Sequence, residues 1–276
     1  MNFLFWNIHK NKNCFNIIRD IVYTEDVDIL MIAEYPPETN EIDLLTVINQ
    51  SPCTYLYQYV SPIANYDKIK IYTRFNSTFI QPLRDETGFS AKEYFSPLLN
   101  NKVTFITCHF PSKINKSDAD LSEYAEDVKE FIEMVEKDTG HQRTIVCGDL
   151  NMNPFDYGLV KARGLHAVME KSIAQKNHVT VRGNKYSFFY NPMWGFLGDS
   201  GYGSVSGTMY YNSNDAINYY WHLYDQVLIR PELIHTFDNK RLEIITDIKD
   251  ISLLTKKRTI DKKYSDHLPI KFNLKI

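Results

Sequence analysis

A carboxylate and an amide lie two residues apart after an apolar run near the middle of the chain. Residues 145–147 form this run and predict a buried strand, and Asp149 and Asn151 follow it. If the strand conformation continues, both side chains leave the same face of the strand. Such a pair is suited to holding a water molecule and a phosphoryl oxygen. Asp and Asn close to a proline are also typical of a helix N-terminus, so both interpretations are open at this point.

Polar residues of the same kind recur at other predicted strand ends and in the adjoining loops. They are Asn7, Glu34, His109, Asp225 and the pair Asp266 and His267. Each has an ordinary alternative: Asn7 could cap a helix, Glu34 could be a solvated strand end, and His109 could be a turn histidine. In layered α/β proteins, however, sites gather where strand ends and their loops converge. The recurrence therefore favours one shared site.

The hydrophobic pattern predicts strands and helices that would position these residues. Strands are expected at residues 3–6, 27–33, 69–73, 103–108, 145–147, 226–229, 242–245 and 268–274. Helices are expected around residues 14–22, 44–48 and 121–135, the last capped by Ser117 or Asp118. Asn100 and Asn101 indicate a hairpin turn, and residues 164–224 are loop-rich and aromatic. Without a repeat or a low-complexity linker, residues 1–276 are expected to form a single domain.

Composition places the chain among globular proteins. Of its 276 residues, 43% are hydrophobic and 24% charged, and 31 basic against 34 acidic residues leave a formal charge of −3. No global positive field therefore attracts a polyanion, so one would be bound by local cations or metal. Four scattered cysteines argue against a disulfide framework. With no signal peptide and no apolar stretch near the ~20 residues of a membrane span, a cytoplasmic location and no membrane partner are expected.

Six short motifs, taken in order, resemble the endonuclease/exonuclease/phosphatase superfamily. They are WN at residues 6–7, IAE at 32–34, CHFP at 108–111, GDLN at 148–151, YDQVLI at 224–229 and SDHLPI at 265–270. The resemblance spans nearly the whole chain. It implies a four-layer α/β sandwich, in which two mixed β-sheets pack face to face with helices on the outside. It also implies divalent-metal-dependent hydrolysis of a phosphoester.

The resemblance further implies a metal site and a water site. Glu34 and Asp266 would ligate Mg²⁺ with help from Asn7, since hard oxygen ligands suit that ion, and Mn²⁺ may substitute for it. Asp149 would orient or deprotonate the attacking water. Asn151 would hold that water and a phosphoryl oxygen.

Two histidines complete the implied site. His267, oriented by Asp225, would contact the phosphate as negative charge builds up, because a carboxylate behind an imidazole fixes its tautomer and favours the cation. His109 would protonate or hydrogen-bond the leaving oxygen. In pancreatic-type deoxyribonucleases the equivalent histidine has an acidic partner just before a strand that ends in arginine. Asp67 and Arg74 occupy comparable places here, although Asp67 could equally be a solvated loop residue.

Departures from subfamily patterns narrow the substrate class. The stretch from Leu223 to Gln226 matches neither the inositol polyphosphate phosphatases nor the abasic-site endonucleases of the superfamily. Local cations follow or precede the motifs: Lys10, Lys12, Lys113, Lys116, Lys256, Lys257, Arg258, Lys262 and Lys263. They could grip flanking phosphates of a nucleic acid or simply form a solvated surface. A few aromatic residues between 186 and 224 could stack on bases, while most would pack the core.

The sequence thus predicts a Mg²⁺-dependent phosphodiesterase that acts as a nuclease on a nucleic acid substrate. A phosphatase for a small phosphorylated metabolite or nucleotide is the alternative. A catalytically dead binding scaffold is a third possibility, which the intact motif positions disfavour.

Overall fold

Two mixed β-sheets form the centre of the molecule, and the computed structural model describes residues 1–50, 55–64, 68–96, 101–214 and 216–276. The described strands of the first sheet are, in spatial order, β16 (Glu243–Ile244), β19 (Ile270–Asn273), β1 (Asn2–Asn7), β2 (Ile29–Ala33), β4 (Ile69–Thr73) and β3 (Gln58–Val60). Within it β1 and β2 run parallel, and the other neighbours are antiparallel.

The second sheet has the same mixed character. Its described strands are, in order, β5 (Ile80–Glu86), β6 (Phe89–Ser96), β7 (Asn101–His109), β8 (Thr144–Asp149), β15 (Asp225–Ile229), β12 (Phe189–Tyr190) and β9 (Ala167–Val168). The pairs β7–β8 and β9–β12 are parallel, and the remaining pairs are antiparallel. Each sheet therefore has a parallel pair whose strands end at the same edge.

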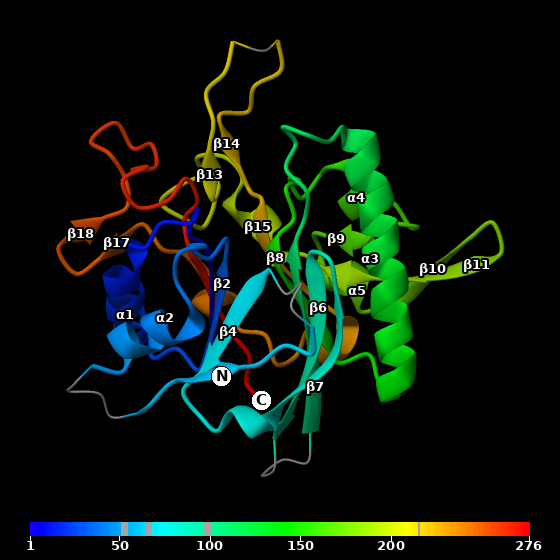
Figure 1. Cartoon of the computed structure of the whole chain (residues 1–276). Coiled ribbons are helices and arrows are strands. Elements are labelled where there is room, and N and C mark those ends of the chain that lie inside the picture. Colours follow the sequence, from blue (N-terminus) through cyan, green and yellow to red (C-terminus); the bar gives the residue numbers. More distant parts are fainter. Residues whose placement is uncertain (51–54, 65–67, 97–100, 215) are drawn as a thin grey trace.

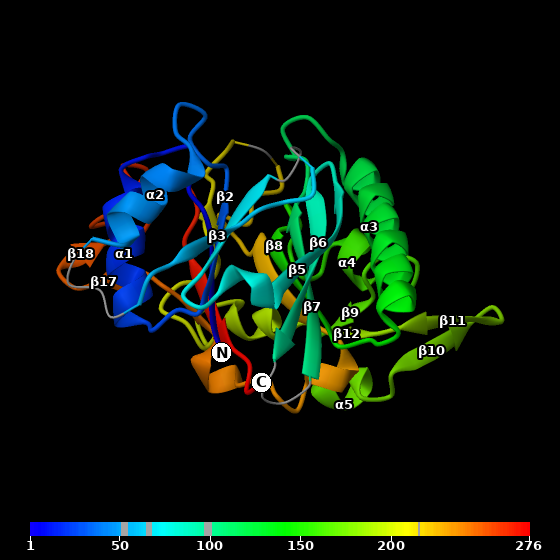
Figure 2. The same ribbon diagram turned by 60° about the horizontal axis from the view of Figure 1, so that its bottom comes forward.

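Helices cover the outer faces of the two sheets. The described helices are α1 (Cys14–Thr24), α2 (Glu41–Ile48), α3 (Asp118–Thr139) and the short α4 (Tyr157–Val160) and α5 (Lys171–Ala174). Figures 1 and 2 show α1 and α2 on one side of the molecule and α3 on the other, with the sheets between them. The predicted four-layer α/β sandwich is confirmed.

Short elements decorate this frame. Three small ribbons pair β10 (His178–Val181) with β11 (Asn184–Ser187), β13 (Met209–Tyr210) with β14 (Trp221–His222), and β17 (Asp247–Ile248) with β18 (Ile251–Ser252). Single 3₁₀ turns lie at Ser77–Phe79, Pro192–Phe196, Pro231–Leu233 and Asn239–Arg241. The ribbon β10–β11 projects from the body of the molecule in Figure 1.

Alternation of apolar side chains builds two hydrophobic layers. Between the sheets, the ring of Phe3 on β1 meets Phe105 on β7 edge to face, with 5.9 Å between ring centroids. The neighbouring residue Ile106 points the other way and packs with Leu121 and Val128 of α3. This period of two is the pattern from which the strands were predicted. The polar residues at the strand ends lie at the edge of the hydrophobic core.

The long helix α3 begins and ends at residues suited to those positions. The Ser117 hydroxyl accepts the main-chain N–H of Asp120, whose carboxylate accepts the Ser117 N–H in return, so Ser117 is the N-cap. Gly140 follows the helix with φ of +74°, a left-handed conformation that glycine adopts without steric cost.

Strands β5 and β6 were not predicted from the sequence, because charged residues interrupt their apolar pattern. In β6 both Lys92 and Glu93 are buried. The Lys92 ammonium donates to the Ser90 hydroxyl at 2.9 Å, and Glu93 pairs with Lys102 and His141. Burial of these groups is tolerated since each has a polar partner. A pattern of apolar residues alone does not reveal such a strand.

Several other expectations have a structural outcome. Cys14, Cys108 and Cys147 are free and buried, whereas Cys53 lies outside the described residues. So does Asn100 of the predicted hairpin turn. None of the helices in the described part of the chain is both long and apolar enough to span a bilayer.

The aromatic segment 164–224 divides into buried and exposed residues. Phe188, Phe189, Tyr190 and Phe196 belong to the core, as expected for most of them. Tyr202, with 84% of its surface exposed, contrasts with these.

Candidate active site

Four of the predicted site residues lie where parallel strands end. Asn7 is the last residue of β1, and Glu34 directly follows β2, its parallel neighbour. His109 and Asp149 end β7 and β8 and are register partners across that parallel pair. The two parallel pairs belong to different sheets, so the site is built from both halves of the sandwich.

Hydrogen bonds from Asn7 and ion-pair contacts of His109 join these four side chains across the two sheets. The Asn7 amide Nδ2 donates to Glu34 Oε1 at 3.2 Å and to Asp149 Oδ2 at 3.1 Å. His109 Nε2 lies 3.5 Å from Glu34 Oε1 and 3.8 Å from Asp149 Oδ2. One amide and one imidazole thus bridge two carboxylates that come from opposite sheets.

Gly148 makes the approach of β7 and β8 possible. A Cβ atom at this position would lie 1.8 Å from the main-chain oxygen of Cys108, its register partner. Only glycine lets the two strands run this closely here. The close pairing sets His109 beside Asp149 at the next register position.

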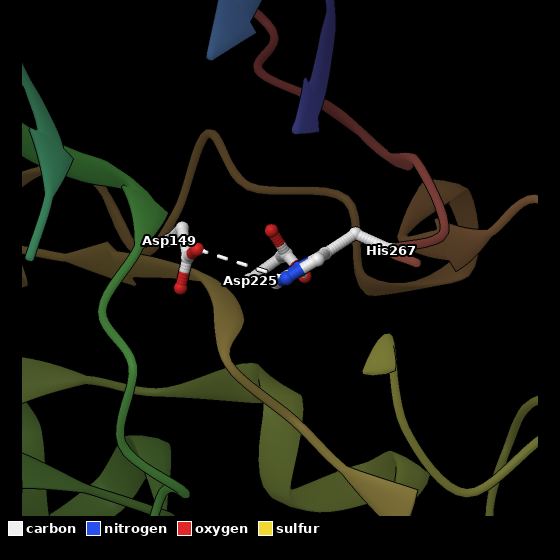
Figure 3. Close-up of side chains that lie close together, drawn as sticks. All are labelled: Asp149, Asp225 and His267. Atoms are coloured by element: carbon white, nitrogen blue, oxygen red, sulfur yellow. Dashed lines mark hydrogen bonds and ion pairs between the residues drawn. The ribbon is translucent and has the colours of Figure 1, made fainter. Parts of the chain in front are cut away.

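Asp225 and His267 form a second buried pair next to Asp149. Asp225 lies opposite Asp149 across the antiparallel pair β8–β15. His267 Nδ1 is 2.8 Å from Asp225 Oδ2, and its Nε2 is 3.9 Å from Asp149 Oδ2. Figure 3 shows the imidazole reaching from the C-terminal segment towards both carboxylates. The Nδ1–H bond to Asp225 fixes the ring so that Nε2 faces Asp149.

The surrounding charges perturb the proton affinities of these groups. Burial alone would lower the pKa of His267, but the negative charges of Asp225 and Asp149 outweigh it and raise this pKa to about 10. Hydrogen bonding from His109 lowers the pKa of Glu34 to about 2, against the opposing effect of burial and with support from Asn7. At neutral pH the site therefore holds an imidazolium, at His267, and an ionised carboxylate, at Glu34.

Three hydrogen bonds hold the segment that carries Asp266 and His267. The Ser265 hydroxyl donates to the main-chain oxygen of Asn7 at 2.7 Å and accepts the His267 N–H at 3.1 Å. The Trp6 indole N–H donates to the His267 carbonyl at 2.9 Å. Ser265 and Trp6 belong to the quoted motifs, but their positioning role follows only from these contacts.

Asn151 reaches the site in a different way from the one predicted. Strand β8 ends at Asp149, and Asn151 has a left-handed conformation with φ of +47°. The expectation that both side chains leave one strand face is therefore wrong. The Asn151 N–H donates to Asp149 Oδ1 at 2.9 Å, and its side-chain Nδ2 donates to the Phe110 carbonyl at 3.0 Å. A tight turn, and not strand alternation, brings the amide next to the carboxylate.

Glu34 and Asp266 fit a divalent cation. Both carboxylates approach the same imidazole nitrogen, His9 Nδ1, at 3.8 and 3.4 Å. Asp266 Oδ1 is buried and makes no hydrogen bond within the described part of the chain. A buried carboxylate oxygen that makes no hydrogen bond at such a place suits a metal ligand, since hard oxygen donors are those that Mg²⁺ selects.

His9 itself was not singled out in the sequence. It sits two residues after Asn7, in the turn that follows β1, and that position is the signal that could have identified it.

Asp149, Asp225 and His267 also come close enough together to hold a metal ion. Their geometry alone does not decide between this cluster and the Glu34–Asp266 pair. In the cluster, His267 Nδ1 is already bonded to Asp225 at 2.8 Å, whereas Asp266 Oδ1 of the pair has no hydrogen-bond partner among the described residues.

Two of the predicted substrate-binding residues do not join this group. Asp67 lies outside the described residues. Arg74 follows β4 at the end where Ile29 pairs with Thr73, which is the end of the sheet opposite Glu34. Its guanidinium binds Asp26 and donates through Nε to Asp28 Oδ1 at 2.7 Å. The structure thus places Arg74 in an ion-pair cluster away from the site, because β2 and β4 run antiparallel.

The remaining predicted cations differ in their availability for a ligand. Lys113 Nζ pairs with Asp156 at 2.8 Å and Asp118 at 2.9 Å, so its charge is already balanced. Lys256 and Lys257 are exposed on a turn of the chain between β18 and β19. Arg258, on the same turn, donates to a main-chain oxygen, that of Ser204.

Comparison with solved structures identifies the fold, although neither a family model nor a curated protein sequence matches the chain. An endonuclease/exonuclease/phosphatase family protein from Bacteroides thetaiotaomicron superposes with a TM-score of 0.58 at 13% identity, over 99% of this chain and 97% of that one. D. rerio TDP2 complexed with a single-strand DNA product gives 0.51 at 13% identity, over 99% and 97% of the two chains. An AP endonuclease from Archaeoglobus fulgidus gives 0.52 at 14% identity over the full length of both. The chain has the fold of the endonuclease/exonuclease/phosphatase superfamily, as its six motifs predict.

Proposed function

We propose that this protein is a Mg²⁺-dependent phosphodiesterase that hydrolyses nucleic acid. The observation that carries the proposal is the convergence of two carboxylates at His9 with the Asp149, Asp225 and His267 cluster at one edge of both sheets. A cation-binding pair of carboxylates beside a further carboxylate and an imidazolium provides the groups that hydrolysis of a phosphate ester by water requires.

The metal would be held by Glu34 and Asp266. Asn7 would orient Glu34 through the bond from its amide. A bound Mg²⁺, or Mn²⁺ in its place, supplies charge neutralisation to the phosphate and lowers the pKa of nucleophilic water.

Asp149 and the side chains around it would act on the attacking water and on the protons that are transferred. Asp149, whose pKa burial raises, would orient the attacking water and accept its proton. The Nδ2 group of Asn151 carries a second N–H beyond the one bonded to Phe110, and this can hold a phosphoryl oxygen. His267, kept protonated by Asp225, would stabilise the charge that grows on the phosphoryl oxygens. His109 would donate to the leaving oxygen.

Two of the structural relatives support nucleic acid as the substrate. One is TDP2 complexed with a single-strand DNA product, and the other is an AP endonuclease. Both have this fold but little sequence identity to the chain, so the substrate class is proposed and awaits measurement.

A hydrolysis panel tests the proposal. Single- and double-stranded DNA and RNA, nucleotides and inositol phosphates are incubated with Mg²⁺ or Mn²⁺ and, in parallel, with excess chelator. We expect cleavage of at least one nucleic acid with metal and none with chelator. Glu34→Gln should lower the rate by orders of magnitude without changing the melting temperature by more than a few degrees. Full activity in chelator would remove the mechanism, and preference for a mononucleotide would favour the phosphatase alternative.

A further inference from the structure

A pocket of about 480 Å³ adjoins the proposed site on the side of Glu34 and His109, both of which line it. It lies between the loop that joins β2 to α2 and the start of β4. Pockets of this size accept groups as large as a nucleotide. Of the cations that the sequence suggested for flanking phosphates, Lys10 lines it, and two further lysines that were not singled out, Lys68 and Lys70, line it as well.

Three lysines converge on this pocket from two chain segments. Lys10 belongs to the turn after β1, and its N–H donates to the Glu34 carbonyl at 2.8 Å. Lys68 and Lys70 come from β4 and the residue before it. Since Ala33 pairs with Ile69 across β2 and β4, Lys68 is set beside Glu34 at the next position along the ladder.

Two of these cations are free to bind a ligand. Lys70 is engaged, with Glu41 at 3.8 Å and the Tyr59 hydroxyl at 3.4 Å. Lys10 and Lys68 are exposed, and within the described residues neither ammonium group has an ion-pair or hydrogen-bond partner. Two unpaired ammonium groups beside a carboxylate that would carry a metal ion give the pocket a positive field towards an anion.

The opposite wall of the pocket is preformed. Tyr35 donates its hydroxyl to the Asn40 carbonyl at 2.9 Å, and its ring lies 5.5 Å from that of Phe15. The Thr39 hydroxyl closes the adjoining turn by donating to the Pro36 carbonyl at 2.9 Å. A wall held by these contacts loses little conformational freedom when a ligand enters.

We infer that this pocket binds a second phosphate of the substrate, on the leaving-group side of the scissile bond. The side assignment rests on the proposed function, because His109, which would donate to the leaving oxygen, also lines the pocket. Lysine ammonium groups are compact point charges that bind phosphate without a fixed geometry. The site thus selects substrates whose leaving nucleoside carries a further phosphate.

The kinetic test compares matched substrates on matched variants. The substrates are a dinucleoside monophosphate, the same molecule with a terminal phosphate at either end, and bis(p-nitrophenyl) phosphate, which has no second phosphate. The variant is Lys10→Gln with Lys68→Gln. Lys137→Gln is the control, since Lys137 is exposed on α3 and does not line the pocket.

We expect the wild type to have a lower KM when the extra phosphate is on the leaving nucleoside. The double variant should raise that KM by about fivefold for each lysine, which corresponds to the largest contribution usual for an exposed ion pair. The control variant should leave that KM unchanged. Its kcat/KM on bis(p-nitrophenyl) phosphate should stay within about twofold of the wild type. A trinucleotide as good as the phosphorylated dinucleotide identifies a backbone phosphate as the ligand, and a worse one identifies a terminal phosphate. Preference for phosphate on the other nucleoside overturns the inference.

A binding measurement separates this inference from the proposed function. Calorimetry with Mg²⁺ compares a nucleoside 3′,5′-bisphosphate with the two monophosphates on wild type, double variant and control. If the wild type binds the bisphosphate more tightly than the monophosphates and the double variant does not, the phosphate-binding role of the pocket is supported. This holds even if no diester is hydrolysed and the proposed function fails. Hydrolysis of nucleic acid with no lysine dependence in either assay leaves the function standing and overturns the pocket.

Discussion

At the scale of single residues, Asp149 is the side chain on which the proposed chemistry depends most. One of its oxygens accepts from the Asn151 N–H and the other from the Asn7 amide, and burial raises its pKa. This arrangement orients the carboxylate and increases its affinity for a proton. Both are required of a group that takes a proton from water.

Asp149→Asn should therefore nearly abolish turnover while leaving the fold unchanged. The amide keeps the size of the side chain but cannot accept the proton, and general-base assistance is worth ~10² to 10⁴ in rate. Single-turnover rates and thermal melts on the same preparations measure both quantities. A variant with the wild-type kcat would show that Asp149 only anchors the turn at Asn151.

The Asp225–His267 pair should behave as a unit. Because Asp225 holds the imidazole through the 2.8 Å bond and keeps it protonated, removing either residue removes the same contribution. Asp225→Ala, His267→Ala and the double variant should lose similar factors in kcat, as groups that act together are non-additive. Rate losses that multiply in the double variant would instead assign the two residues independent roles.

At the scale of elements, the strand that carries Asp149 is positioned by a residue without a side chain. Gly148→Ala would bring a Cβ atom to 1.8 Å from the Cys108 carbonyl, so β7 and β8 would have to separate. We expect a loss of several kcal/mol in the free energy of unfolding, as for other overpacked sites, together with loss of activity.

Denaturant unfolding of Gly148→Ala measures the first effect, and the hydrolysis assay measures the second. Gly183→Ala is a matched control. Gly183 also has positive φ, but a Cβ there meets nothing within 4 Å. Equal stability losses in the two variants would mean that backbone conformation, and not the contact with Cys108, accounts for the change.

Elements with a clean period were predictable, and those that bury charge were not. Strand β1 and helix α1 follow directly from the spacing of their apolar residues, and the positions of Asn7, Glu34 and His109 at strand ends follow with them. Strand β6 was missed because Lys92 and Glu93 are buried in it. The polar partners of these two residues, such as Ser90 for Lys92 and His141 for Glu93, are not evident from the hydrophobic pattern and are identified only in the folded chain.

The details of the site also depend on contacts that spacing does not encode. The left-handed turns at Glu34 and Asn151, with φ of +48° and +47°, redirect side chains immediately after their strands. A sequence pattern that assumes continued strand geometry cannot anticipate such a change of direction. The prediction that Arg74 lies near the site was wrong for a related reason. Because β4 runs antiparallel to β2, the end of β4 that Arg74 follows lies opposite the end of β2 that carries Glu34.

At the scale of the whole molecule, the site exists only when the two sheets are packed together. Asn7 and Glu34 come from the first sheet, and Asp149 and Asp225 from the second. Their contacts therefore depend on the hydrophobic layer between the sheets, in which Phe3 meets Phe105. The fold thus supplies a rigid frame, and the strand ends and loops on it supply the chemistry.

Charge at this scale bears on how a nucleic acid would be held. The formal charge of −3 provides no overall attraction for a polyanion, so binding must rely on local cations. Lys256 and Lys257 are exposed candidates, on the turn that precedes the segment with Asp266. Each phosphate contact to a single strand contributes a slope of about 0.7 to the dependence of log affinity on log salt concentration.

Replacing Lys256 and Lys257 by Gln should flatten the salt dependence of oligonucleotide binding by about 0.7 for each lysine that contacts a phosphate. Dissociation constants and kcat/KM are measured against oligonucleotide length at several salt concentrations. Lys137→Gln serves as a control, because Lys137 is exposed near the C-terminal end of α3. This end of the helix connects to the first residue of β8, whereas Asp149 is the last residue of that strand. Hydrolysis of bis(p-nitrophenyl) phosphate should be the same in all three proteins, since that substrate has no flanking phosphate. If wild-type binding and turnover depend on neither length nor salt, the nuclease proposal fails and a phosphatase for a small phosphorylated metabolite takes its place.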